Sequence, residues 1–202
     1  METGSPYAGV AKNRWVKVTE SLVGVYPLCR KDIVSVVLES WEAIFHSKIG
    51  RRGFQIGKEI FPKPQILGFL LHELIPLEVA ARFPKEWRGD ISSDEKDLVF
   101  IPDPRFSVEI KTSSHKTQIF GNRSYAQKPS ESKKKKSGYY LAVNFGKCDA
   151  ATPKPVIHRI RFGWLDHTDW VGQKAATGQQ AHLKADAEAK KLLLLYAGGC
   201  EV

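Results

Sequence analysis

Glu109 and Lys111 stand two positions apart in the stretch FSVEIKTSS, residues 106 to 114. Apolar and polar residues alternate there, which predicts a β-strand with Val108 and Ile110 on one face. Glu109 and Lys111 then share the opposite face. A carboxylate and an ammonium group placed in this way could hold a metal ion and orient a water molecule. A plain salt bridge on the face of an edge strand is the alternative.

A neighbouring strand should supply a second carboxylate, and Asp97 opens the apolar stretch DLVFI, residues 97 to 101. The prolines of PDPR, residues 102 to 105, cannot donate hydrogen bonds to a strand, so we predict a β-hairpin with its turn there. A four-residue loop places Leu98 opposite Glu109 and turns Asp97 away. A five-residue loop, or one bulge, places Asp97 opposite Glu109. The pattern leaves both registers open.

Two carboxylates and a lysine suit the hydrolysis of a phosphodiester bond. The reaction needs a deprotonated water, neutralised charge on the phosphate and a stabilised leaving oxygen, and carboxylate-bound Mg²⁺ can supply all three. Mg²⁺ often takes only one or two carboxylates, with waters and substrate oxygens completing its shell. We therefore expect Asp97 and Glu109 to hold Mg²⁺ and Lys111 to position the attacking water. Asp103 lies in the turn, six positions before Glu109, and is excluded on geometry.

Asp97, eleven further residues and Glu109-Ile110-Lys111 together resemble the motif of the PD-(D/E)xK nuclease superfamily. Lys96 stands where that motif is usually written with a proline. The resemblance implies that Asp97, Glu109 and Lys111 are catalytic. It also implies that the metal is contacted at Asp97, Glu109 and Ile110.

Glu73 is a polar residue within the apolar run ILGFLLHELIPLEVAARF, residues 66 to 83, which reads as a buried helix that Pro76 bends or ends. Burying an unpaired charge is expensive. Members of this superfamily often supply an extra carboxylate from an N-terminal helix, so the resemblance makes Glu73 a catalytic candidate, ahead of Glu59 and Glu78. Pairing of Glu73 with a neighbouring arginine is the alternative.

Longer stretches resemble the ScaI group of type II restriction endonucleases. The matching pieces are LGFLLHELIPLE, VEIKTSS, IFGNRSYAQ and IRFGWLDHTDW, which together span roughly residues 66 to 180. The resemblance implies a homodimeric endonuclease that requires Mg²⁺ and cuts double-stranded DNA at a short palindromic site. A repair or junction-resolving nuclease on the same core and a non-enzymatic DNA-binding protein are the alternatives.

Polar residues after the catalytic strand are candidates for contacting DNA. Arginine can read guanine, and asparagine can read adenine, through two hydrogen bonds in the major groove. A turn in which Asn122 caps and Arg123 binds a phosphate or a carboxylate is the alternative. Two arginines on a later strand share a face that could line a groove or be solvated. The candidate DNA contacts are Ser113, Ser114, Asn122, Arg123, Ser124, Tyr125, Gln127, Arg159 and Arg161.

The charge of the chain agrees with a polyanionic partner. Its 31 Lys and Arg residues exceed its 22 Asp and Glu residues, for a net charge of +9. A positive field of this size favours nucleic acid first and an anionic membrane second. Because no basic amphipathic helix stands out, we expect DNA. The run KKKK, residues 133 to 136, either contacts phosphates or forms a solvated loop.

The remaining features predict a cytoplasmic protein without a membrane partner. No apolar run approaches the roughly 18 residues needed to cross a membrane, and the N-terminus lacks the apolar core of a signal peptide. Cys29, Cys148 and Cys200 lie far apart and outside any CxxC pattern, which argues for a reducing compartment and against a cysteine-based zinc site. We expect residues 1 to 16 to be mobile.

The order of elements predicts one α/β domain over residues 1 to 202, with a mixed central β-sheet flanked by helices, as in the core of restriction endonucleases. A helix over residues 31 to 49 would use its apolar face either in the core or in a dimer interface. Residues 84 to 96 read as a polar loop. Further strands are predicted over residues 138 to 145 and 155 to 165, and DAEAKKLLLLY reads as a final helix.

Overall fold

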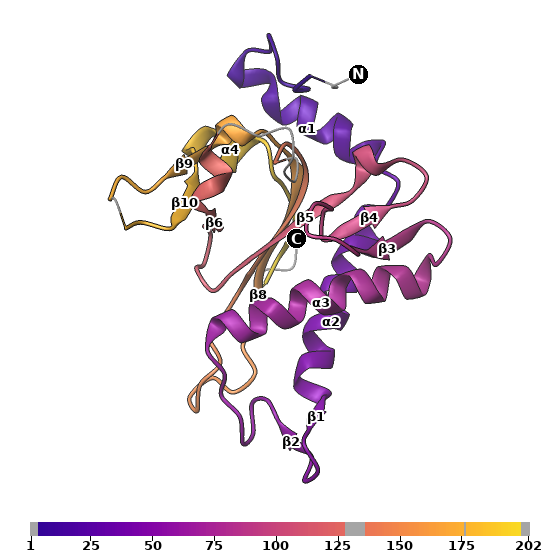
Figure 1. Ribbon diagram of the computed structural model, residues 1–202, viewed down its shortest axis with the longest axis vertical. Helices are drawn as coiled ribbons and strands as arrows, with labels where there is room; N and C mark the ends of the chain where they lie inside the picture. The colour runs from indigo at the N-terminus through magenta and orange to yellow at the C-terminus, as the bar shows by residue number, and fades with distance from the viewer. Residues whose placement is uncertain (1–3, 128–135, 176, 199–202) are drawn as a thin grey trace.

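A central six-stranded β-sheet organises the computed structural model, which describes residues 4–127, 136–175 and 177–198 (Figure 1). Only β5 and β7 run parallel, and every other neighbouring pair is antiparallel. This mixed sheet, flanked by helices, confirms the predicted α/β class. From edge to edge the strands are β11 (Leu193–Ala197), β8 (Ile157–Leu165), β7 (Gly138–Phe145), β5 (Val108–Ser113), β4 (Leu98–Phe100) and β3 (Trp87–Gly89).

Two long helices cover one face of this sheet. The predicted helices are confirmed as α2 (Arg30–His46) and α3 (Pro64–Arg82), and α3 continues through the buried Pro76 rather than ending there. The apolar face of α2 lies in the main core, so that face is not available for a dimer interface. The other helices are α1 (Trp15–Gly24), α4 (Ala185–Lys190) and the 3₁₀ helices η1 (Lys12–Arg14), η2 (Pro104–Phe106), η3 (Arg123–Ala126) and η4 (His167–Asp169).

A small second sheet covers the other face, opposite α2 and α3 in Figure 1. Its antiparallel strands, in order, are β6 (Phe120–Asn122), β10 (Gln180–Leu183) and β9 (Trp170–Gly172). It packs on the central sheet through a separate core built of Ile119, Tyr140, Ala142, Leu165, Trp170, Ala181, Leu183 and Leu192. A third, two-stranded sheet joins β1 (Lys48–Ile49) to β2 (Phe54–Gln55).

The C-terminal part of the chain differs from the prediction of one helix. The helix α4 ends at Lys190, and the leucine-rich run that follows forms β11. The physical reason is the edge of β8, whose unpaired backbone groups accept a strand, with Leu193 opposite Phe162. The expected polar loop over residues 84 to 96 likewise contains the edge strand β3.

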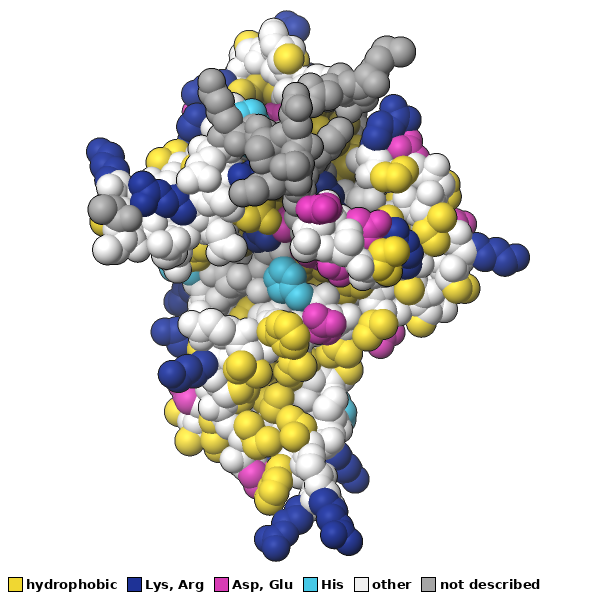
Figure 2. Space-filling model, in the orientation of Figure 1, with side chains coloured by type: hydrophobic (Ala, Val, Ile, Leu, Met, Phe, Trp, Pro, Cys, Tyr) yellow, Lys and Arg dark blue, Asp and Glu magenta, His cyan; other side chains and the backbone are white. Residues whose placement is uncertain are grey.

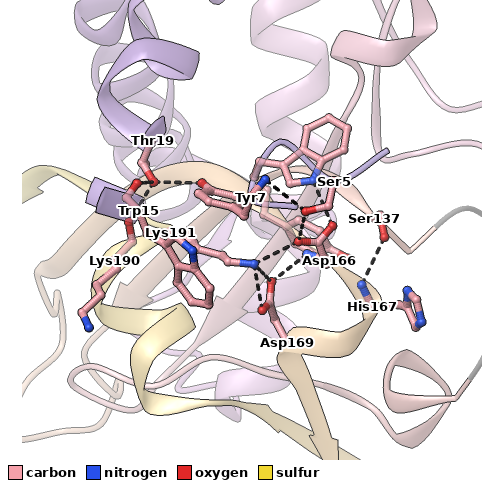
Figure 3. Close-up of polar contacts among 12 residues, drawn as sticks. Ser5, Tyr7, Trp15, Thr19, Ser137, Asp166, His167, Asp169, Lys190 and Lys191 are labelled. Atoms are coloured by element: carbon pink, nitrogen blue, oxygen red, sulfur yellow. Dashed lines mark hydrogen bonds and ion pairs between the residues drawn. The ribbon is translucent and has the colours of Figure 1, made fainter. Parts of the chain in front are cut away.

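The N-terminal segment, residues 4 to 16, lies against the domain, and its expected mobility stays a prediction. The buried Lys191 ammonium contacts Asp166 at 2.9 Å and Asp169 at 2.8 Å, and the rings of Tyr7 and Trp15 lie over it (Figure 3). Tyr7 is 5% exposed. This aromatic cover shields the charged cluster from water.

None of the helices in the described part of the chain is long and apolar enough to cross a membrane.

Candidate active site

Asp97 and Glu109 lie opposite each other where β4 meets β5. Leu98 of β4 pairs with Val108 of β5, and one step further along the antiparallel register pairs Asp97 with Glu109. The hairpin therefore has the register in which Asp97 lies opposite Glu109, and not the one that places Leu98 opposite Glu109. Asp97 Oδ2 accepts a hydrogen bond from the Ile110 amide at 2.6 Å. The two carboxylates thus share one end of the hairpin.

Glu109 and Lys111 share one face of β5, as the alternation predicts, and that face is turned away from α3. The Lys111 ammonium donates to Glu109 Oε1 at 2.7 Å, and the Glu109 side chain is only 3% exposed. The parallel neighbour β7 places Tyr140 beside Glu109 and the small Ala142 beside Lys111. The pair therefore lies in a largely dry environment, where its geometry is well defined.

Tyr125 is the second donor to Glu109. Its hydroxyl donates to Oε1, the same oxygen that Lys111 binds, and the Lys111 ammonium lies 4.6 Å from the centre of its ring. Burial and the charge of Glu109 raise the pKa of Tyr125 well above its ordinary value, so the phenol stays protonated and donates. The sequence predicts that Tyr125 contacts DNA, but in the structure its hydroxyl binds Glu109 within the protein.

The residue that α3 brings to this site is His72, not Glu73. His72 Nδ1 lies 3.6 Å from Asp97 Oδ2. Glu73 is exposed, on the side of α3 that carries the exposed Ile66 and Phe69. The argument that Glu73 is a buried charge is therefore wrong, because one step along a helix turns a side chain by about 100°. His72 stands next to Glu73 in LLHELIP, and no periodicity in that apolar run distinguishes the two.

The chemistry of these donors fits Mg²⁺. Within residues 4–127, 136–175 and 177–198, no three His, Cys, Asp or Glu side chains gather into a group that could hold a metal by themselves. Asp97 and Glu109 nevertheless offer two hard oxygen ligands, which is the number that Mg²⁺ commonly takes when waters and phosphate oxygens complete its shell. The Ile110 side chain is fully buried, so only its backbone can take part. In an extended strand the amide and the carbonyl of one residue point to the same side. Because the Ile110 amide points at Asp97, the Ile110 carbonyl also points toward the side of the strand on which Asp97 lies.

The segment after β5 contributes fewer exposed groups than predicted. The Arg123 guanidinium donates to the carbonyl oxygens of Ala175 and Gly178, both at 3.3 Å, so it tethers the loop between β9 and β10. Ser113 Oγ accepts from the His115 amide at 3.1 Å within a turn. Ser113 and Ser114 are half-buried. Within this segment, the exposed members of the predicted set are Asn122, Ser124 and Gln127.

Arg159 and Arg161 are separated by burial although they share a face of β8. Arg161 is 5% exposed and donates to Asn144, to the Thr117 carbonyl and to Glu188. It holds the loop after β5 against the sheet, so the prediction that it lines a DNA groove is contradicted. Arg159 is exposed and stays a candidate. Of the predicted basic run, residues 133 to 135 lie outside the described part of the chain.

A groove of about 960 Å³ is lined by neighbours of the carboxylates in the chain, although Asp97 and Glu109 are not themselves among its lining residues. Val99 and Ser107 line it, each two positions from a carboxylate on the same strand face, and Lys96, Lys136 and His167 line it further along. The groove therefore continues the face of the sheet that carries Asp97 and Glu109.

Comparison with known proteins gives two matches to this chain. A family model described as ScaI restriction endonuclease matches residues 5–196. The Type II restriction enzyme ScaI of Streptomyces caespitosus is 53% identical over 197 residues, which cover 96% of this chain and 86% of that enzyme.

Proposed function

The chain belongs to the ScaI restriction endonuclease family, and from that premise we propose that it is a type II restriction endonuclease. It hydrolyses phosphodiester bonds of double-stranded DNA at a short palindromic site and requires Mg²⁺. The observation that carries this proposal is the placement of Asp97 opposite Glu109, with Lys111 on the same carboxylate. No comparable observation favours a repair nuclease or a non-enzymatic DNA-binding protein.

Asp97, Glu109 and the carbonyl of Ile110 would hold the metal. Bound there, Mg²⁺ lowers the pKa of a water and neutralises charge on the phosphate. Lys111 is held by Glu109 at the edge of this site, where its ammonium can orient the attacking water. The half-buried His72 faces Asp97 from α3 and limits the directions that this carboxylate can take.

Tyr125 acts on the reaction through Glu109. Its hydroxyl and the Lys111 ammonium both bind Oε1, which favours Oε2 as the oxygen that would bind the metal. Hydrogen bonds of this kind orient a metal ligand and raise its affinity. Tyr125 is therefore a positioning residue in this proposal.

The DNA backbone would follow the groove beside the carboxylates. Phosphate contacts fix the position of a protein on DNA, and Lys136 and His167 line this groove. Arg159, with its exposed guanidinium, is a further candidate for a phosphate contact. Because the Arg123 guanidinium is hydrogen-bonded to backbone carbonyls, we expect the exposed side chains around Arg123 to contact the DNA bases instead.

We assign the homodimer contact to the exposed face of α3. Cutting both strands of a palindrome needs two active sites related by a two-fold axis. Ile66, Phe69 and Leu77 are 52%, 59% and 63% exposed and lie with Glu73 along one side of α3. Figure 2 shows apolar side chains gathered over α3 and the β1–β2 hairpin. A second copy that covers this stripe would remove it from water and lie next to the helix that reaches the active site.

The test is to incubate the protein with plasmid DNA and Mg²⁺ and to sequence the ends. Discrete fragments with one shared terminal motif support a type II restriction endonuclease. Random fragments, cleavage confined to branched DNA, or no cleavage at any divalent ion concentration would contradict it.

A further inference from the structure

The outer face of the small sheet carries a row of three amide side chains. Asn122 of β6 is the register partner of Gln180 of β10. On the other side of Gln180, one step beyond the pair of Ala181 and Gly172, lies Gln173, whose backbone amide donates to the Gln180 carbonyl at 2.9 Å. The side-chain Oε1 of Gln173 accepts from the Gln180 backbone amide at 3.3 Å, which leaves the side-chain N–H donors of Gln173 available. Directly opposite residues of antiparallel strands share a face. Asn122, Gln180 and Gln173 are all exposed, so the row faces solvent.

The neighbouring row of residues on the three strands faces the interior, and for this reason the amide row faces outward. Gly121, Ala181 and Gly172 form it, and their side of the sheet faces inward. A side chain at Gly121 would come within 3.2 Å of the Tyr125 and Trp170 rings, and at Gly172 it would come within 3.4 Å of Arg123. The two glycines therefore let η3 pack directly beneath the sheet, which fixes the orientation of the amide row above it.

The same packing connects the amide row to the active site. Tyr125 of η3 contacts the inner row and binds Glu109, and Arg123 of η3 holds the loop between β9 and β10. The small sheet, η3 and the catalytic strand are thus joined through hydrogen bonds and ring contacts. A group bound on the outer face has a fixed position relative to the metal-binding carboxylates.

The chemistry of the row suits base edges rather than phosphates. An amide offers one acceptor and two donors, which match the N7 and N6 groups of adenine in the major groove. Phosphates would instead be met by the exposed Lys174 and Lys184, which flank the row at the two ends of the β9–β10 hairpin. Figure 2 shows Lys and Arg side chains on this protruding part of the molecule. Two- and three-stranded sheets are known to read grooves of DNA in this way.

We propose that the amide row of Asn122, Gln180 and Gln173 is the base-reading surface and that it contacts adenine-containing base pairs in the major groove. This inference rests on the proposed function, since only an enzyme that selects a sequence needs such a surface. It adds Gln173 and Gln180, which the sequence did not single out. It also assigns the recognition to the sheet rather than to Arg123.

The test uses a library of randomised duplex DNA. The wild-type protein and the variants Asn122→Ala, Gln180→Ala and Gln173→Ala are incubated with it and Mg²⁺, and the cut ends are sequenced. Gln65→Ala removes an exposed amide from the start of α3, outside the small sheet, and serves as the matched control. Circular dichroism checks that each variant is folded. Equilibrium binding to the wild-type site and to singly altered sites completes the measurement.

We expect each row variant to accept other bases at one A·T pair per half-site and to bind the wild-type site roughly 10- to 100-fold more weakly. Binding to unrelated DNA and the profile of Gln65→Ala should stay within about twofold of the wild type. Row variants whose cleavage profiles match the wild type, or whose affinity falls equally on every sequence, overturn this inference alone. A wild-type protein that selects no sequence overturns the proposed function and this inference together.

Discussion

Replacing Tyr125 by Phe should raise the Mg²⁺ concentration needed for half-maximal cleavage by about 10- to 100-fold. The substitution keeps the ring that lies 4.6 Å from the Lys111 ammonium and removes only the hydroxyl that donates to Glu109 Oε1. A hydrogen bond to a charged group contributes about 1.5–3 kcal/mol. Loss of an outer partner of a metal-binding carboxylate typically costs 10- to 100-fold in metal affinity or activity, which agrees with that free energy.

The assay is the initial rate of cleavage of a single-site duplex, with DNA saturating, over a series of Mg²⁺ concentrations. Tyr139→Phe is the matched control, because Tyr139 neighbours Tyr140 on β7 but lies in the main core on the other face of the sheet. Its Mg²⁺ dependence should match that of the wild type. A Tyr125→Phe enzyme with unchanged Mg²⁺ dependence would refute the positioning role. An enzyme that needs less Mg²⁺ would show instead that Tyr125 competes with the metal for Glu109.

Four further outcomes follow from the site and the fold. The variants Asp97→Asn, Glu109→Gln and Lys111→Met should each lose cleavage but remain folded and bind specific DNA in gel-shift assays. Near-native turnover in one of these variants would show that the substituted residue is not part of the active site. Ca²⁺ should support specific binding without cleavage, because its larger and looser shell does not align the water; efficient cutting in Ca²⁺ alone would contradict this. The wild-type protein should sediment as a dimer and Phe69→Glu as a monomer, whereas Val25→Glu, at a position 74% exposed after α1, should sediment like the wild type; a wild-type monomer or a Phe69→Glu dimer would contradict the proposed interface. Arg161→Met should lower the free energy of unfolding in urea by about 3 kcal/mol, because Glu188, Asn144 and the Thr117 carbonyl lose their hydrogen-bond donor. Arg159→Met, at an exposed position, should change this free energy by about 0.5 kcal/mol or less. Equal effects of the two substitutions would contradict the buried role of Arg161.

The alternation of residues 106 to 114 was enough to predict that Glu109 and Lys111 share a face, because side chains of a strand alternate whatever surrounds it. Apolar runs likewise predicted α2, α3, β7 and β8, since their periods and lengths reflect burial directly. The resemblance to a nuclease motif singled out Asp97 as the candidate for the second carboxylate. These features depend on local geometry or on a short motif, and both are present in the one-dimensional sequence.

The register that brings Asp97 opposite Glu109 depended on the turn. The helix η2 forms there, and the Asp103 side chain caps its N-terminus by accepting a hydrogen bond from the Arg105 amide. Proline content alone does not specify that conformation. The choice between His72 and Glu73 depended on the rotation of α3 about its axis, which only packing against the sheet determines.

The partners of polar side chains were also decided by the tertiary structure. Arg123, Tyr125 and Arg161 read alike in the sequence as groups able to contact DNA, yet each has its acceptor within the protein. The amide row exists only because β6 pairs with β10, a strand far away in the chain. Sequence patterns report which residues are polar, whereas the acceptor that satisfies each one depends on contacts between distant segments, which only the folded chain brings together.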